Sequence, residues 1–210
     1  MTKVKICGIT NEGDALNAAR LGADFIGFLV EIGFSEDKIS REKAKGIIKK
    51  LPLEVSPVFV TYLQKAGLII EIAKEINPQV IQLHNAIELE EIGKIRKALP
   101  KIKITKSIPV DESAMKEAKK YEKYADYILL DTRGKYGRGG TGKTHNWSIS
   151  AEIRKEIKKP VFLAGGLNPD NVGEAIRTVK PFAVDTNSGV KEKPRFKNYE
   201  KMEMFIEAAK

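Results

Sequence analysis

The chain has 210 residues, a length that suits one domain and lies near the lower limit for an eightfold β/α barrel. Its formal net charge of +9 would suit a nucleic-acid binder, a membrane-surface protein or an enzyme for anionic substrates. Lysines recur beside glutamates along residues 42–45 and 152–159, a pattern typical of solvated helix surfaces, which argues against the nucleic-acid binder and the membrane-surface protein. A single cysteine excludes an internal disulfide and a cysteine-rich metal site.

The predicted elements alternate, from the N-terminus onward, between short and long segments. Short apolar runs rich in β-branched residues predict strands, and the segments between them have helical periodicity. The predicted strands are residues 4–7, 25–30, 55–61, 80–83, 102–108, 127–131, 161–164 and 182–185. The predicted helices are residues 14–21, 41–50, 66–76, 88–99, 113–121, 148–158, 169–179 and 199–209.

This alternation predicts parallel strands joined by crossover helices. Because no linker-like composition divides the chain, we expect a single α/β domain over residues 1–210, a closed (β/α)8 TIM barrel. An open doubly wound sheet is the alternative that strand counting leaves open. Glycine-rich segments after the sixth, seventh and eighth strands favour the barrel, since barrels commonly bind phosphate there.

The N-terminal residues enter the first predicted strand at once, without a basic region followed by an apolar run, so no signal peptide is visible. No apolar stretch approaches the roughly 18 residues of a membrane span. We therefore expect a cytoplasmic protein.

Cys7 ends the first predicted strand and is followed directly by Gly8. A lone cysteine is often a small buried apolar residue. It can also be a base that removes a proton from carbon, if a cation or amide dipoles lower the pKa of its thiol. The glycine after it would let a ligand approach the backbone.

Asp131 ends an apolar strand of the pattern Ile-Leu-Leu-Asp. A buried carboxylate must find partners or become protonated. It could cap a helix or accept a loop hydrogen bond, or it could act as a general acid if its pKa is raised in a pocket.

Three glycine-rich segments, residues 139–143, 164–169 and 185–190, follow the last three strands. Each is weak evidence alone, because turns need glycine. The first does not match a nucleotide-hydrolysing Walker A loop, whose two glycines have four residues between them. Together the segments predict a phosphate site formed by backbone amides.

These motifs, taken in order, resemble the phosphoribosylanthranilate isomerase family of tryptophan biosynthesis. The resemblance runs nearly end to end, through residues 5–10, 81–84, 129–132, 139–144, 147–148, 165–172 and 181–190. It implies an Amadori rearrangement of a phosphoribosyl amine, with Asp131 as the general acid and Cys7 as the general base. Proton transfer alone suffices for this chemistry, so no cofactor and no metal are expected.

The resemblance also implies the rest of the site. Gln82 and His84 would line the mouth near the fourth strand, although a satisfied polar loop end is an equally good interpretation of both. The 5-phosphate would lie among Gly140, Thr141, Gly142, Gly165, Gly166, Asn187, Ser188 and Gly189.

Two segments depart from the family pattern. Family members carry an arginine after the second strand that pairs with the anthranilate carboxylate, whereas this chain has Glu36-Asp37-Lys38 there. Lys38 or Arg41 could substitute for that arginine, although lysine lacks the bidentate fork of arginine. The usual Ser-Ser-Gly-Val-Glu reads Asn-Ser-Gly-Val-Lys, ending at Lys191. These departures concern the aromatic half of the substrate.

Two other functions stay open: an isomerase for a different phosphosugar, which the unusual loop after the second strand favours, and a non-catalytic barrel that binds a phosphate ligand or nucleic acid, which the net charge favours slightly. We expect a small phosphosugar as the partner, neither nucleic acid nor membrane, and either a monomer or a homodimer.

Overall fold

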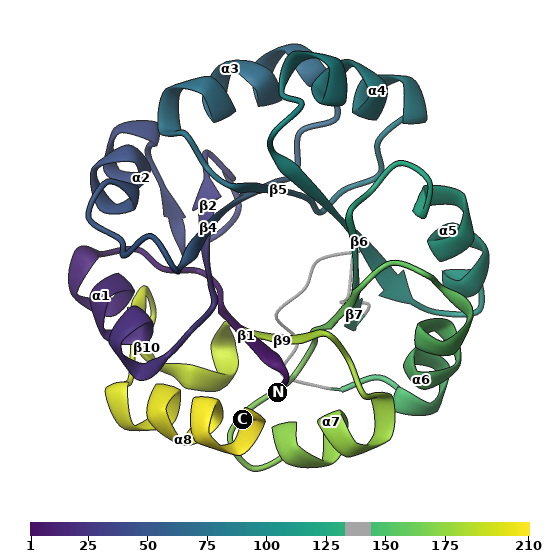
Figure 1. Ribbon diagram of the computed structural model, residues 1–210. Coiled ribbons are helices and arrows are strands. Elements are labelled where there is room, and N and C mark those ends of the chain that lie inside the picture. Colours follow the sequence, from purple (N-terminus) through teal and green to yellow (C-terminus); the bar gives the residue numbers. More distant parts are fainter. Residues whose placement is uncertain (133–143) are drawn as a thin grey trace.

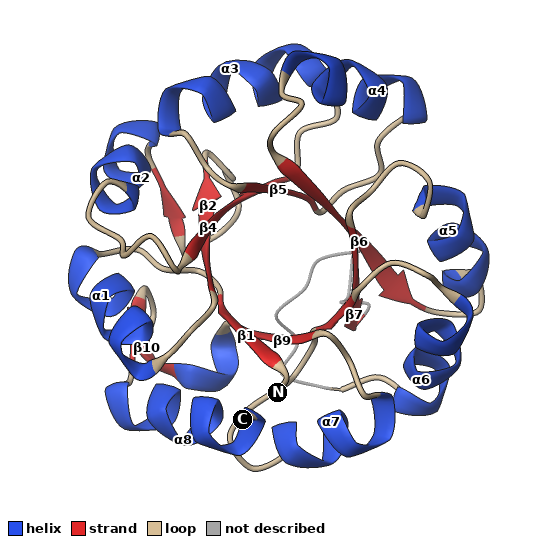
Figure 2. Ribbon diagram, in the orientation of Figure 1, coloured by secondary structure: helices blue, strands red, loops and turns tan. Residues whose placement is uncertain are grey.

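The computed structural model describes residues 1–132 and 144–210, and within them the chain forms a closed parallel β/α barrel (Figure 1). The strands form an inner ring and the helices an outer ring (Figure 2). The ring closes because β1 (Lys3–Ile6) pairs in parallel with both β2 (Phe25–Val30) and β9 (Ala183–Thr186). The predicted TIM barrel is therefore confirmed, and the open sheet is excluded.

The remaining strands of the ring are β4 (Ser56–Thr61), β5 (Val80–Leu83), β6 (Lys103–Val110), β7 (Tyr127–Thr132) and β8 (Val161–Leu163). The outer helices are α1 (Glu12–Leu21), α2 (Arg41–Ile48), α3 (Ala66–Ile76), α4 (Leu89–Ala98), α5 (Ala114–Tyr121), α6 (Trp147–Glu156), α7 (Val172–Val179) and α8 (Tyr199–Ala209). None of the helices in the described ranges is long and apolar enough to cross a membrane.

Short additional elements flank the ring near one another. Strand β3 (Lys38–Ile39) pairs with the end of β2, and a hairpin of β10 (Lys191–Lys193) and β11 (Phe196–Lys197) follows the 3-10 helix η2 (Ser188–Val190). The sequence does not predict them, because two- or three-residue strands rich in lysine carry no readable period.

The apolar side chains separate into two clusters, one on each side of the strand ring. The larger lies between strands and helices, and the smaller fills the barrel interior. In the smaller cluster Phe162 packs edge-on against Phe25 and Tyr127, with ring centroids 5.1 and 5.3 Å away. Since Phe25 and Tyr127 each begin a strand, these rings fill the end of the barrel where the strands start, and the site lies at the other end.

Residues 169–171 form a turn rather than the predicted first turn of a helix. The Asn168 side chain accepts hydrogen bonds from the backbone N–H groups of Asp170 and Asn171. This local bonding competes with helical bonding, so α7 begins only at Val172.

Candidate active site

A pocket of about 380 Å³ lies where the strands end, within the size range of small-molecule sites. Side chains from β5, β7 and β9 meet there with Cys7, which directly follows β1, although they are distant in the sequence, because strand ends converge at one mouth of such a barrel. The sequence-predicted residues among the lining are Cys7, Gln82, His84, Asp131, Gly165, Gly166, Asn187 and Ser188.

Cys7 follows β1 and its backbone N–H donates to the carbonyl of Thr186 in β9, 2.8 Å away. Its thiol lies against Gly27 of β2, where an added Cβ would be 2.7 Å from Sγ, so a larger residue there would displace it. Burial raises the pKa of the Cys7 thiol, while the positive charge and hydrogen bond of Lys5 oppose this rise. The resting group is therefore a thiol that has a cation beside it.

Asp131 lies near the end of β7, where its Oδ1 accepts a hydrogen bond from the backbone N–H of Thr132, 2.8 Å away. Burial raises the pKa of this carboxyl to about 7, and the negative charge of Asp185 adds to the rise. A carboxyl of that pKa is half protonated at neutral pH, so it can donate a proton to a bound substrate.

A polar network of mostly buried residues borders the pocket. Lys5 Nζ donates to Asp185 Oδ2 and to Gln82 Oε1, each 2.7 Å away, and Gln82 Nε2 lies 3.3 Å from His84 Nδ1. Burial opposes the charge on Lys5, but Asp185 and Cys7 raise its pKa, so it is an ammonium group. The network thus connects Lys5, which borders the thiol, with the residues that border Asp131.

His84 lies at the other end of this network, with Nε2 3.7 Å from Asp131 Oδ2. Burial, together with the charges of Lys106 and Lys5, lowers the pKa of His84 to about 3. The imidazole is therefore neutral at pH 7, and its contact with Asp131 is not an ion pair.

Lys5 and Asp185 also belong to the site, although neither was predicted from the sequence as a site residue. Lys5 is 1% exposed and Asp185 is 7% exposed, and they pair across neighbouring strands. The available signal was a charged residue within an apolar strand, two positions before Cys7 and hence on the same face of β1.

The glycine loops border the pocket beside these groups. Gly165 and Gly166 have φ angles of +92° and +68°, and a Cβ at Gly189 would lie 2.0 Å from the Leu167 carbonyl oxygen. Gly165 and Gly189 therefore require glycine, and the positive φ angle of Gly166 favours it. Gly189 lines an adjoining hollow with Gly166 and Ser188. The predicted phosphate residues Gly140, Thr141 and Gly142 lie outside the described residues.

Lys38 and Arg41 do not line the pocket. Lys38 Nζ donates to the carbonyl of Gly33, and Arg41 is held on the helical side by Glu31 at 2.8 Å and Glu71 at 2.5 Å. Both side chains thus have anionic or carbonyl partners outside the pocket lining.

The fold and the pocket define a class of protein. A β/α barrel whose strand ends present a carboxyl group that titrates near neutrality, a thiol beside a buried lysine, and glycine loops can move protons on a small anionic molecule. These features are those of a β/α-barrel enzyme that catalyses proton transfer.

Comparisons with known proteins give the family. Residues 4–208 match the family described as N-(5'phosphoribosyl)anthranilate (PRA) isomerase. A relative in Methanocella arvoryzae, N-(5'-phosphoribosyl)anthranilate isomerase, is 41% identical, and the match covers 99% of this chain and 97% of the relative. The chain belongs to this family, as the motifs indicated.

Two solved structures share the fold. A phosphoribosyl anthranilate isomerase in complex with reduced 1-(o-carboxyphenylamino)-1-deoxyribulose 5-phosphate has a TM-score of 0.87 and 36% identity, with 100% of this chain and 98% of that chain covered. A structure of monomers generated from the dimeric enzyme of Thermotoga maritima has a TM-score of 0.87 and 37% identity, with the same coverage.

Proposed function

We propose that the chain catalyses the Amadori rearrangement of N-(5'-phosphoribosyl)anthranilate to 1-(2-carboxyphenylamino)-1-deoxyribulose 5-phosphate, a step of tryptophan biosynthesis. The observation that carries this proposal is the shared pocket of Cys7 and Asp131, bordered by the glycine loops, in a chain of this family. The chemistry consists of proton transfers within one molecule, so acid and base groups suffice.

Asp131 acts first in the proposed reaction. Its protonated carboxyl gives a proton to the furanose ring oxygen, and the C1–O bond breaks as the nitrogen lone pair forms a Schiff base. The raised pKa of Asp131, about 7, supports this role because an ordinary aspartic acid would have lost its proton at neutral pH.

Cys7 acts second: once its thiol has released its proton to solvent, the thiolate is the base that removes the proton from C2. The C2–H electrons form the C1=C2 bond of an enolamine, and the Schiff-base nitrogen becomes neutral. Tautomerisation then moves the hydroxyl proton of C2 to C1 and leaves the ketone. Lys5 supports this role because its positive charge and hydrogen bond oppose the rise in the pKa of the thiol that burial causes.

The glycine loops hold the 5-phosphate in this proposal. Backbone N–H groups near Gly165, Gly166 and Ser188 can turn toward an anion, since two of these residues have positive φ angles. Binding the phosphate at this wall would fix C1 and C2 between the acid and the base.

The partner in this proposal is a small phosphosugar, and neither nucleic acid nor membrane is involved. A relative of this family is dimeric. That this chain is either a monomer or a homodimer stays a prediction, and so does its cytoplasmic location.

The test is an assay of the purified chain with phosphoribosylanthranilate, following the loss of anthranilate-type fluorescence. We expect Cys7→Ser and Asp131→Asn each to lower kcat by at least about a hundredfold, because each removes one proton-transfer group. Far-UV circular dichroism checks that both variants fold, and Glu112→Gln, an exposed acid outside the pocket lining, controls for the change of charge.

A variant that keeps a near-normal rate would remove its residue from the mechanism. A wild-type chain that binds a phosphosugar without turning over phosphoribosylanthranilate would instead favour an isomerase for another phosphosugar.

A further inference from the structure

The described lining of the pocket is rich in acids. It contains the carboxylates of Glu36, Asp37 and Asp185 in addition to Asp131, and among the described residues its one lysine or arginine is Lys191. The substrate in the proposed function carries a carboxylate on its aromatic ring as well as a phosphate. A carboxylate that enters this part of the pocket needs a cation.

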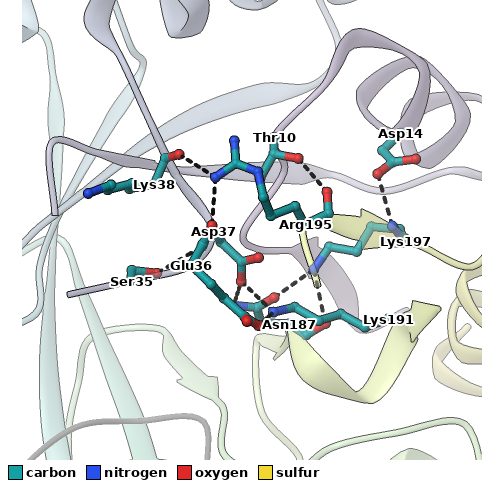
Figure 3. Close-up of polar contacts among 10 residues, drawn as sticks. All are labelled: Thr10, Asp14, Ser35, Glu36, Asp37, Lys38, Asn187, Lys191, Arg195 and Lys197. Carbon is teal, nitrogen blue, oxygen red and sulfur yellow. Dashed lines mark hydrogen bonds and ion pairs between the residues drawn. The ribbon is translucent and has the colours of Figure 1, made fainter. Parts of the chain in front are cut away.

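Lys191 lies at the start of the hairpin and points toward the loop between β2 and β3 (Figure 3). Its Nζ is 2.5 Å from Glu36 Oε1 and 2.7 Å from Asp37 Oδ2. The two sites at which the sequence departs from the family pattern thus contact each other. Glu36 and Asp37 lie in the β2–β3 loop, and Lys191 lies in the hairpin.

The two carboxylates differ in how firmly they are held. The Asp37 side chain is 3% exposed, and its Oδ2 also accepts from Asn187 Nδ2, 3.0 Å away. The Glu36 side chain is 55% exposed. Breaking the contact between Lys191 and Asp37 would leave the Asp37 carboxylate charged and shielded from water. Glu36 can instead release Lys191 and return to water at little cost.

The backbone around Glu36 is held independently of its side chain. Arg195 Nη1 donates to the carbonyls of Glu36 and Lys38, at 2.7 and 3.2 Å, and Lys197 Nζ donates to Asn187 Oδ1 at 2.6 Å (Figure 3). The Glu36 side chain could therefore leave Lys191 while the loop and the hairpin stay in place.

Aromatic rings line the same region of the pocket. Phe34 packs edge-on against Tyr62, with centroids 4.9 Å apart, and the Tyr62 ring lies 4.7 Å from that of His84. An aryl group with a carboxylate fits such surroundings, since the rings offer apolar contact and Lys191 offers positive charge.

We propose that Lys191 binds the carboxylate on the substrate's aromatic ring, and that Glu36 occupies this position on Lys191 until the substrate displaces it. The inference rests on the proposed function and assigns a specificity-determining residue to it. An ammonium group has three N–H donors, so Lys191 can keep Asp37 while it exchanges Glu36 for the substrate.

The test compares two stable ligands by calorimetry: reduced 1-(o-carboxyphenylamino)-1-deoxyribulose 5-phosphate, and the same compound without the carboxylate. We expect Lys191→Gln to weaken binding of the carboxylated ligand at least about tenfold and to change binding of the other little. Lys191→Arg should retain the preference, and Lys193→Gln, an exposed lysine of the same hairpin, is the matched control.

Glu36→Gln provides the second arm, because it removes the competing carboxylate without burying a charge. The carboxylated ligand should bind about twofold to fivefold tighter to this variant, and the other ligand should bind as before. If Lys191→Gln does not fold, this arm decides alone.

Equal losses for both ligands in Lys191→Gln, or no gain for the carboxylated ligand in Glu36→Gln, would overturn the inference. Wild-type turnover of phosphoribosylanthranilate is measured in parallel. Its absence would contradict the proposed function, whereas turnover with an unchanged ligand preference in both variants would contradict only the assignment of Lys191.

Discussion

Asp131 shows how its surroundings tune a single residue for chemistry at the expense of stability. Its pKa rises from 3.8 to about 7 because burial disfavours the charged form. Below pH 3.8 both the folded and the unfolded chain hold the proton. Between these values the unfolded chain releases a proton that the folded chain keeps, so the free energy of unfolding falls as the pH rises, and the full penalty is present above pH 7.

We therefore expect Asp131→Asn to raise the free energy of unfolding at pH 8 by on the order of a few kcal/mol, and to change it little at pH 4, while abolishing most activity. Urea titrations at the two pH values measure the difference. The free energy of unfolding of Glu112→Gln should differ from that of the wild type by about the same small amount at both pH values. If Asp131→Asn is less stable than the wild type at pH 8, burial does not hold the pKa of Asp131 near 7.

At the scale of elements, two glycines illustrate opposite demands on the backbone. Gly165 follows β8 with a φ of +92°, and a Cβ there would lie 2.1 Å from Thr132 Oγ1. Gly93 lies within α4 and an added Cβ would meet nothing within 4 Å. The first glycine is required by close approach of two strand ends, whereas the second only weakens its helix.

Accordingly, Gly93→Ala should stabilise the protein by about 0.5–1 kcal/mol, since alanine favours helix more than glycine does. Gly165→Ala should destabilise it by about 1–3 kcal/mol, because the residue would be strained and would displace Thr132. Chemical unfolding of both variants at one pH measures the pair. Equal effects of the same sign would contradict this distinction between the two glycines.

At the scale of the whole molecule, the barrel joins the two ends of the chain. β1 pairs with β9, and α8 packs beside α1 (Figure 1). Lys210 Nζ donates to the carbonyl of Gly22, 2.7 Å away. The last helix therefore completes a layer that the first helix begins. Such closure predicts one cooperative domain over residues 1–210.

We expect urea unfolding to give one transition, with the same midpoint by far-UV circular dichroism and by the fluorescence of Trp147, the single tryptophan. Its position in α6 makes it a probe of the C-terminal half, while circular dichroism averages over all helices. Separate midpoints would indicate that the two halves unfold independently and would contradict the single domain.

The sequence alone was enough for the eight barrel strands, the outer helices and the family, because periodicity and motifs are properties of neighbouring residues. It also predicted which residues share a mouth, such as Cys7 and Asp131, since barrel topology brings strand ends together. The buried Lys5–Asp185 pair was within reach of the same reasoning, as a charge inside an apolar strand.

Only the tertiary structure decided which cation of the described residues lines the pocket. Lys38 and Arg41 are close in sequence to the expected position, yet their side chains face Gly33 and three glutamates. Lys191 reaches the pocket through a hairpin too short to predict, and its partner Glu36 is 155 residues away. Side-chain direction and long-range pairing depend on how packed segments meet, which no local pattern encodes.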